Sequence, residues 1–185
     1  MNNVELRIPL KKYLIYRKNW MNNPKTMEYN AGYDIELKGY DKNTGTIRKT
    51  NQELNEWYDK WSNKEPDKFF AYIYDSNIEE PVGEIYYYLD NDIHSMGILI
   101  ADKYRGNGYN TKALLELEKI AFEKNNINEL SDMIPVDRIG AINCFIKAGF
   151  RQTDIINEEI KFGKTVNLRQ LLLTKEEYKS RKELK

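Results

Sequence analysis

The sequence predicts an α+β fold in which a mixed, largely antiparallel sheet is flanked by helices. Three strand-like segments (68–76, 81–90 and 94–101) follow one another with short turns between them, which is typical of antiparallel neighbours. Two later segments with apolar residues at helical spacing are each followed by a further strand-like segment. Because helices and strands do not alternate regularly, the order favours α+β over a doubly wound α/β fold.

The first third of the chain predicts one strand and two helices. Residues 4–10 alternate apolar and polar side chains, as in a strand, and residues 11–23 predict a short helix that ends before Pro24. Residues 51–63 predict a second helix, because Thr50 and Glu53 have the spacing of a capping box. The turn-rich stretch between these helices allows no assignment.

The rest of the chain gives clearer signals for strands and helices. The aromatic-rich strands 68–76 and 81–90 are expected to form a hairpin, followed by the strand 94–101 and an amphipathic helix after Gly108. A strand within 127–136 and a helix from 137 to Ala148, which Gly149 is placed to cap, come next. The expected closing hairpin pairs 150–156 with 165–173 around Gly163.

Length and composition indicate one domain over residues 1–185, with residues from about 175 to 185 expected to be an exposed, fraying helix. Lysine plus arginine and aspartate plus glutamate each number 29, so no basic surplus favours nucleic acid. No apolar run is long enough for a membrane span, and no secretory signal pattern precedes residue 13. A single histidine and a single cysteine argue against a metal site or a disulfide. We therefore expect a cytoplasmic, metal-free protein.

Residues 104–111, "YRGNGYNT", place two glycines between a strand and a helix. The spacing fits neither a Walker A loop nor the dinucleotide fingerprint, whose third glycine would fall on Thr111. A plain turn is one interpretation, since glycine is common in turns. The alternative is an anion site, because free N–H groups between Gly106 and Thr111 and the helix dipole would favour a phosphate. Arg105 would add a charged donor.

The stretch "GILIADKYRGNGYNTKAL" resembles the acetyl-CoA-binding segment of the GNAT N-acetyltransferase superfamily, whose pattern is R/Q-x-x-G-x-G/A. Arg105 and Gly108 match, whereas Asn110 occupies the last Gly/Ala position. "DRIGAINCFIKAGF" is similar to the family's later helix, with Arg138 in place of the usual asparagine and Phe145 in place of the usual tyrosine. The segments "YNAGYD" and "WYDKW" also resemble a bacterial branch whose acceptor is unassigned.

The resemblance implies a GNAT-like fold and transfer of an acetyl group from acetyl-CoA to an amine in a ternary complex. Main-chain groups of the loop would hold the diphosphate, and an N–H near Leu99 would polarise the thioester carbonyl. The cofactor-binding residues expected on this basis are Ile98, Leu99, Ile100, Arg105, Gly106, Asn107, Gly108, Tyr109, Asn110, Thr111, Arg138 and Phe145.

An acetyltransferase needs a route for the proton of its acceptor, because a primary ammonium has a pKa near ~10 and is mostly charged at pH 7. Glu84, on the strand before the cofactor strand, is the first candidate for the base. His94 and Asp92 come next. For each of them, a solvated or hydrogen-bonded surface role is the alternative.

The departing thiolate must also regain a proton. The family's usual donor would be the tyrosine whose place Phe145 takes, and a phenyl ring cannot donate. Tyr104 and Tyr109 are nearby candidates, and water is another, whereas Cys144 is expected to pack as a small apolar residue. Arg138 is a candidate contact for the cofactor, with a solvated helix start as the alternative.

Aromatic residues and carboxylates in the first half suit a cationic amine, although most of these rings are expected in the core. The acceptor is expected to be a small-molecule or peptide amine, and the oligomeric state stays open, a homodimer included. The alternative to an enzyme is a non-catalytic acyl-CoA-binding module or sensor with the same fold. A third interpretation is an interaction protein whose glycine loop is only a turn.

Overall fold

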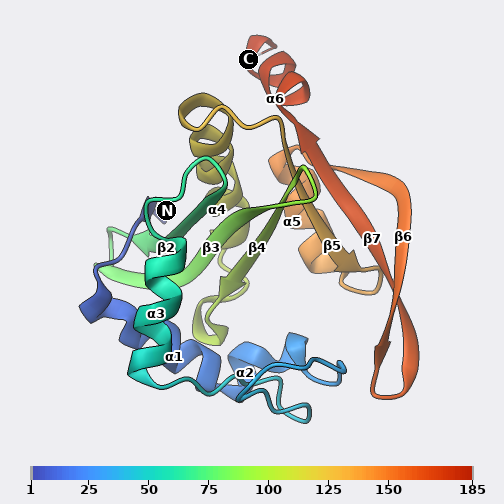
Figure 1. Ribbon diagram of the computed structural model, residues 1–185. Helices are drawn as coiled ribbons and strands as arrows, with labels where there is room; N and C mark the ends of the chain where they lie inside the picture. Colours follow the sequence, from blue (N-terminus) through green and yellow to red (C-terminus); the bar gives the residue numbers. More distant parts are fainter. Residues whose placement is uncertain (1, 185) are drawn as a thin grey trace.

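The computed structural model describes residues 2–184 and confirms the predicted α+β class (Figure 1). Within these residues one seven-stranded sheet has the order β1-β2-β3-β4-β5-β7-β6. Its strands are β1 Val4–Arg7, β2 Lys68–Asp75, β3 Glu80–Asp90, β4 Ile93–Ile100, β5 Glu129–Pro135, β6 Arg151–Lys161 and β7 Lys164–Thr174. Neighbours pair antiparallel except β4 and β5, which are parallel. The sheet is therefore mixed and largely antiparallel, as predicted.

The helices follow the predicted order along the chain. They are α1 Leu14–Asn22, α2 Pro24–Met27, α3 Asn51–Trp61, α4 Tyr109–Glu118, α5 Ile139–Ala148 and α6 Lys175–Glu183. Shorter 3₁₀ segments are η1 Lys11–Tyr13, η2 Glu28–Asn30 and η3 Asp102–Tyr104, and the π-helical segment η4 Lys119–Lys124 continues α4. None of the helices within residues 2–184 could cross a membrane, since each is too short or too polar.

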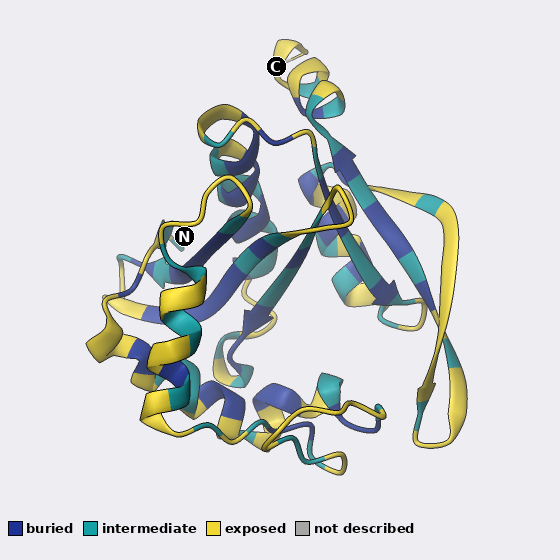
Figure 2. Ribbon diagram, viewed as in Figure 1, coloured by how far each residue is buried: buried dark blue, intermediate teal, exposed yellow. Residues whose placement is uncertain are grey.

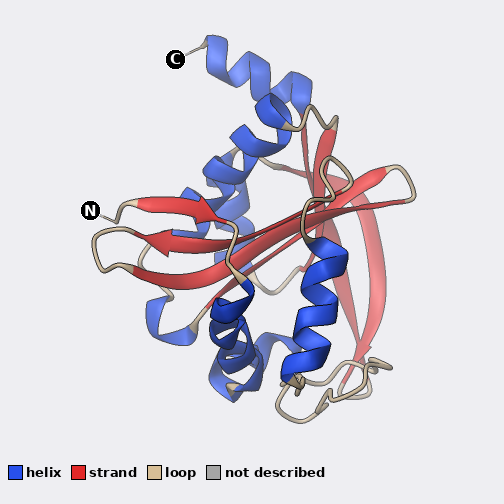
Figure 3. Ribbon diagram, turned by 60° about the vertical axis from the view of Figure 1, so that its left-hand side comes forward, coloured by secondary structure: helices blue, strands red, loops and turns tan. Residues whose placement is uncertain are grey.

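Helices cover both faces of the sheet (Figure 3). The main core lies between the sheet and the helices α4 and α5, and it includes Leu114, Leu117 and Phe145, each almost completely buried. A second apolar cluster on the other face joins α1 and α2 to β2 and β4 through residues such as Trp20 and Phe70. Strands β3 and β4 are therefore packed between two layers of side chains.

Local sequence signals account for the helix ends. Thr50 and Glu53 form the predicted capping box at the start of α3, and Gly149 adopts a left-handed conformation (φ 106°) after α5. The region around Pro24 differs from the expectation. Pro24 does not simply end a helix, because Asn23 accepts hydrogen bonds from the next turn and Pro24 occupies the first position of α2.

The C-terminal part also differs from the expectation of a wholly exposed helix. The ring of Tyr178 in α6 is only 5% exposed and packs 5.2 Å from that of Phe122. By contrast, β6 is exposed along almost its whole length and runs with β7 as a long ribbon away from the core (Figure 2). The ribbon is longer than predicted, because its polar outer half lacks the apolar alternation that indicates a strand.

Candidate active site

Strands β4 and β5 separate near the centre of the sheet. They are paired at one position, Ser95 with Ser131. Beyond it β4 continues to Ile100 and β5 to Pro135, and Figure 1 shows the two strands running apart. Main-chain groups of two parallel strands that no longer pair are left without their usual ladder partners. We call the opening between residues 96–100 and 132–135 the divergence.

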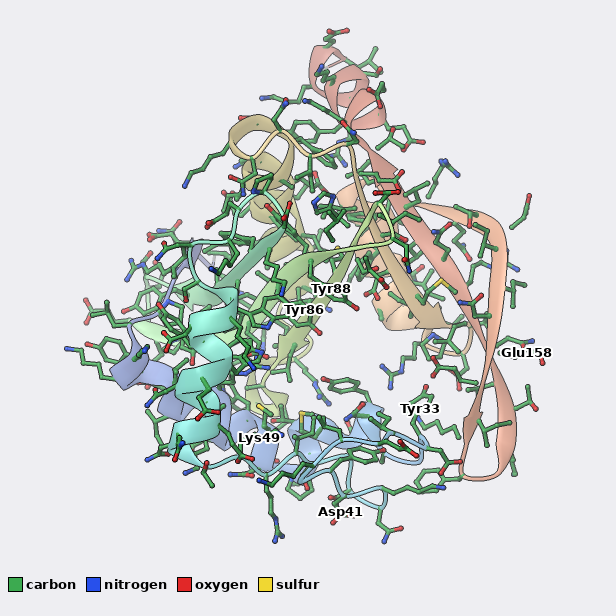
Figure 4. All side chains as sticks on the ribbon, viewed as in Figure 1. Tyr33, Asp41, Lys49, Tyr86, Tyr88 and Glu158 are labelled. Carbon is green, nitrogen blue, oxygen red and sulfur yellow. The ribbon has the colours of Figure 1, made fainter. Side chains whose placement is uncertain are left out.

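An aromatic group lies beside the divergence, on the face of the sheet that α1 and α3 cover. Tyr86 and Tyr88 of β3 stack on each other, and Trp61 of α3 meets both rings edge-on at 5.4 and 5.9 Å. Gly97 makes room for this arrangement, since a Cβ there would lie 2.5 Å from the hydroxyl of Tyr86. Figure 4 shows Tyr86 and Tyr88 at this edge of the opening. We call these three rings the aromatic wall.

The hydroxyl of Tyr86 donates no hydrogen bond to any residue that the structure describes. Desolvation, followed by Tyr29 and the charges of Glu84 and Asp132, raises the pKa of Tyr86 well above its usual value, so the phenol stays protonated. The charge of Arg17 lowers the pKa by less. The hydroxyl of Tyr86 is therefore a neutral hydrogen-bond donor next to Gly97.

Asp132 is the residue of β5 directly after the last position paired with β4. Its half-buried carboxylate makes no ion pair with a described residue. Desolvation raises the pKa of Asp132 to about 7, against smaller lowering effects from the N–H of Met133 and the charge of Arg138. The charge of Asp132 in turn contributes to the raised pKa values of Tyr86 and Tyr88. Asp132 thus combines a position at the divergence with a titration near neutral pH.

Glu84, the first candidate for the base, lies on β3 and is 3% exposed. It forms a buried ion pair with Arg17 of α1, whose guanidinium stacks 3.9 Å from the ring of Trp57. The second carboxylate oxygen, Oε2, is buried and accepts no hydrogen bond from a described residue. Glu84 therefore lies within the layer between α1 and the sheet, paired to a cation, and its role as a base stays a prediction.

His94 and Asp92 lie at the opposite end of β4 from the opening. His94 and Gly97 are three residues apart on β4, so the side chain of His94 lies on the opposite face of the sheet, the one that α4 covers. There its ring meets that of Tyr87 edge-on, and its Nε2 is 3.2 Å from the carbonyl oxygen of Pro66. Desolvation lowers the pKa of His94. Asp92 is exposed in the turn between β3 and β4. Neither His94 nor Asp92 lies at the aromatic wall.

The glycine loop, residues 105–108, leads from η3 into α4. Gly106 and Gly108 both have φ of +78°, and a Cβ at either would meet nothing within 4 Å. The main-chain N–H groups of Gly106, Asn107 and Gly108 donate no hydrogen bond to a described residue, and the first turn of α4 adds further free donors. The loop is thus an exposed, left-handed turn with its amides available to an anion.

The side chain of Arg105 contacts segments outside the glycine loop. Its guanidinium donates to the carbonyl oxygens of Ile100 and Thr26 and pairs with Glu28 at 2.6 Å, so it fastens the loop to α2 and η2. These three bonds leave one N–H on each of its two terminal nitrogens, and the role of Arg105 as an extra phosphate donor stays a prediction. Asn110, at the departure from the family pattern, has a buried Oδ1 that accepts no hydrogen bond from a described residue.

The structure also shows the surroundings of Tyr104 and Tyr109, the candidate proton donors. Tyr109 is buried and donates to Asp75 at 2.7 Å, and Tyr104 donates to Glu80. Both hydroxyls are therefore committed to carboxylates of β2 and β3 rather than free. Phe145 is 1% exposed and packs edge-on against Phe150, while Cys144 is half-buried on α5.

Two cations lie on the other side of the divergence. Arg138, just before α5, and Lys161, at the end of β6, both donate to the carbonyl oxygen of Tyr29. The ribbon tip is fixed there by a 2.7 Å hydrogen bond from Phe162 to Gly32 and a bridge between Tyr33 and Lys161. Figure 4 shows Tyr33 below the opening, across from Tyr86. We call Arg138 and Lys161 the cationic rim.

A separate pocket lies outside this site. Its volume is about 460 Å³, and the N-terminal residues, α4 and α6 line it, Lys112 and Arg181 among them. It includes none of the residues of the aromatic wall or the cationic rim, and Arg181 is engaged there with Glu118.

The family match and the shared fold together support an acetyltransferase of the GNAT type. The model of the family "Acetyltransferase (GNAT) domain" matches residues 11–151, and the chain therefore belongs to this family. No protein of curated function matches the chain in a sequence search.

Solved structures are similar over nearly the whole chain. A spermidine N-acetyltransferase from Vibrio cholerae, solved with CoA and spermine, has a TM-score of 0.75 at 18% identity and covers 95% of this chain and 97% of its own. An acetyltransferase of the GNAT family from Bacillus anthracis has a TM-score of 0.70 at 13% identity, covering 95% and 98%. A putative ribosomal-protein-serine acetyltransferase from V. cholerae reaches 0.64 at 13% identity, covering 94% and 95%. At these identities the likeness establishes the shared fold.

Sequence reasoning did not single out Asp132, Lys161 or the placement of Tyr86. Asp132 had one available signal, an acidic residue within an otherwise apolar strand segment, "LSDMIP". Lys161 had none, because it lies among other charges in an exposed ribbon and reaches the site only through the tertiary fold.

Proposed function

We propose that this protein transfers an acetyl group from acetyl-CoA to a primary amine of a small molecule, by direct attack in a ternary complex. The observation that carries the proposal is the divergence of β4 and β5, with Asp132 where the strands part. The glycine loop lies after the end of the same strand β4. Membership of the GNAT family supports the reaction class.

The residues present fit the cofactor. The free amides of residues 106–108 and of the first turn of α4 would hold the diphosphate, and the absence of a Cβ at Gly106 and Gly108 leaves the approach open. The main chain of residues 98–100, which β5 does not pair, would hold the pantetheine arm. When bound, acetyl-CoA supplies the acetyl group as an activated thioester.

Asp132 is the base in this proposal. An ordinary aspartate, with a pKa near 3.9, is about six pKa units too acidic to take a proton from an ammonium of pKa ~10. A pKa of about 7 reduces that mismatch by half and leaves the carboxylate substantially ionised at neutral pH. Once protonated, Asp132 is more acidic than a free thiol of pKa about 8.5 and can give the proton up again.

Tyr86 assists as a neutral hydrogen-bond donor beside Gly97. Because its raised pKa keeps the phenol protonated, it stabilises a developing negative charge by a hydrogen bond without giving up its proton. Tyr86 is therefore not a substitute for the proton donor whose place Phe145 takes, and the departing thiolate regains its proton from Asp132. Glu84, paired with Arg17, supports the layer behind the aromatic wall.

The direct test is release of free thiol from acetyl-CoA with a panel of primary amines. Stimulation of thiol release by an amine, together with detection of the N-acetyl product by mass spectrometry, is the expected result. Tight binding of CoA by calorimetry, with no amine giving turnover, would instead indicate the alternative, a non-catalytic acyl-CoA-binding module. No thermal shift with CoA would contradict both.

A further inference from the structure

The cationic rim is the part of the site that acetyl transfer alone does not explain. Arg138 and Lys161 both lie within hydrogen-bond distance of one carbonyl oxygen, that of Tyr29, so their charged groups are close neighbours. They come from distant parts of the chain, the start of α5 and the tip of the β6–β7 ribbon. The fold therefore brings two like charges together at the divergence.

No described carboxylate neutralises this pair. Neither Arg138 nor Lys161 forms an ion pair within residues 2–184. Asp137, Glu159 and Asp132 are the acidic groups close enough to affect Lys161, Tyr33 or Arg138, and all act at longer range. Desolvation and then the charge of Arg138 lower the pKa of Lys161. Besides the carbonyl oxygen of Tyr29, Arg138 lies 5.1 Å from the ring of Tyr29 and Lys161 lies 5.1 Å from the ring of Tyr33. These partners are all uncharged, so the half-buried pair of cations is short of negative charge.

A purely structural role does not account for both cations. One neutral donor would satisfy the carbonyl of Tyr29, and a second cation on the same oxygen adds repulsion. The ribbon tip is already fastened to the 31–34 segment by the Phe162–Gly32 hydrogen bond, which involves neither charge. The arrangement is instead the one that binds a carboxylate or a phosphate, for which a planar guanidinium and an ammonium are the usual partners.

We infer that the acceptor is an amine that also carries a carboxylate or phosphate group, held between Arg138 and Lys161 while its amine lies near Asp132. The inference rests on the proposed function and narrows its substrate class. It also separates this chain from acceptors such as the spermine bound by the V. cholerae neighbour, because a polyamine would bring further positive charge to the rim. The ordinary partner for a polyamine would be a group of carboxylates.

Matched pairs of amines test this inference by differing in the anionic group. Lysine is compared with cadaverine, which lacks only the carboxylate, and phosphoethanolamine with ethanolamine, while spermidine serves as a polycation. We expect the anionic member of at least one pair to have a kcat/KM at least about tenfold above its partner and above spermidine. Which pair shows the preference distinguishes carboxylate from phosphate.

Substitutions test whether Arg138 and Lys161 cause the preference for the anionic amine. Arg138→Gln and Lys161→Gln should each raise KM for the anionic amine about tenfold, and neither should raise KM for the partner amine that lacks the carboxylate or phosphate. Lys164→Gln, an exposed lysine in the same ribbon, is the matched control and should change neither. Calorimetry of the anionic amine with the CoA-bound protein should show the same loss, and the affinity for CoA should stay unchanged in Arg138→Gln.

The possible failures are distinct. A kcat/KM of both cadaverine and ethanolamine at least equal to that of their anionic partners, or a kcat/KM of spermidine at least equal to that of both anionic amines, would overturn the inference and leave acetyl transfer intact. A loss of CoA affinity in Arg138→Gln, with the amine preference unchanged, would assign Arg138 to the cofactor and also overturn it. Turnover of no amine at all, with CoA bound, would contradict the proposed function itself.

Discussion

The two sides of the divergence are built in different ways. The proposed cofactor side is one short stretch of chain, residues 98–111, which offers main-chain amides and two glycines. The acceptor side is assembled from side chains of five separate segments, among them Tyr86, Asp132, Arg138 and Lys161. A contiguous main-chain site leaves a spacing pattern in the sequence, whereas a dispersed side-chain site does not.

The largest expected effect is on the acceptor side. Asp132→Asn removes the base but keeps the shape of the side chain, and we expect kcat to fall by about 10²- to 10⁴-fold. The affinity for CoA by calorimetry should be unchanged, because the glycine loop is not touched. A variant with near-normal kcat would exclude Asp132 as the base.

On the cofactor side, Gly108→Val should raise the dissociation constant of CoA at least about tenfold, because a branched side chain fills the open space and disfavours φ of +78°. Gly163→Val is the matched control, since Gly163 has a similar φ of +72° and equally open surroundings at the ribbon turn. Calorimetry with CoA measures both. If the two variants bind CoA equally well, the loop is only a turn.

Glu84→Gln sharpens the comparison between two candidate bases. The change leaves Arg17 buried without its counter-charge, so we expect the free energy of unfolding to fall by about 3 kcal/mol, while kcat falls far less than in Asp132→Asn. Urea titration and thiol release give the two values. A loss of turnover that is large at pH 7 and small at pH 9 would instead assign the base to Glu84.

The smallest effect concerns stability. Because the pKa of Asp132 is raised in the folded state, its ionisation destabilises the fold as pH rises from about 4 to about 7. Asp132→Asn should therefore be more stable than the parent at pH 8, by roughly 1–2 kcal/mol since solvent screens the half-buried carboxylate, and equal to it at pH 4. Equal stability at both pH values would mean that the carboxyl titrates normally.

The sequence predicted the fold well because its signals are local. The capping box of Thr50 and Glu53, the left-handed Gly149 and the hairpin around Gly163 each specify an element end by themselves. The region 29–51 could not be assigned, since it contains little regular structure and is fixed by contacts with the ribbon tip and α1.

The site was predictable only in part. A strand, two glycines and a helix in order indicate the exposed turn at residues 106–108, whose role in binding the cofactor stays a prediction. The sequence places Glu84 on the strand before the cofactor strand, but it does not show that Arg17 lies opposite it. Asp132 lies at the opening because the pairing of β4 with β5 ends at Ser131. Lys161 reaches the site because of the path of the 24-residue ribbon, residues 151–174. Both placements depend on the tertiary structure.

The measurement that tests the central claim most directly is the pH dependence of kcat/KM for an accepted amine, in the parent protein and in Asp132→Asn. We predict that kcat/KM of the parent rises with pH, bends near pH 7 and then levels off, as Asp132 loses its proton. In Asp132→Asn the bend should vanish, and kcat/KM should keep rising toward the pKa of the amine itself, near ~10. A bend near pH 7 that persists in Asp132→Asn would contradict the account.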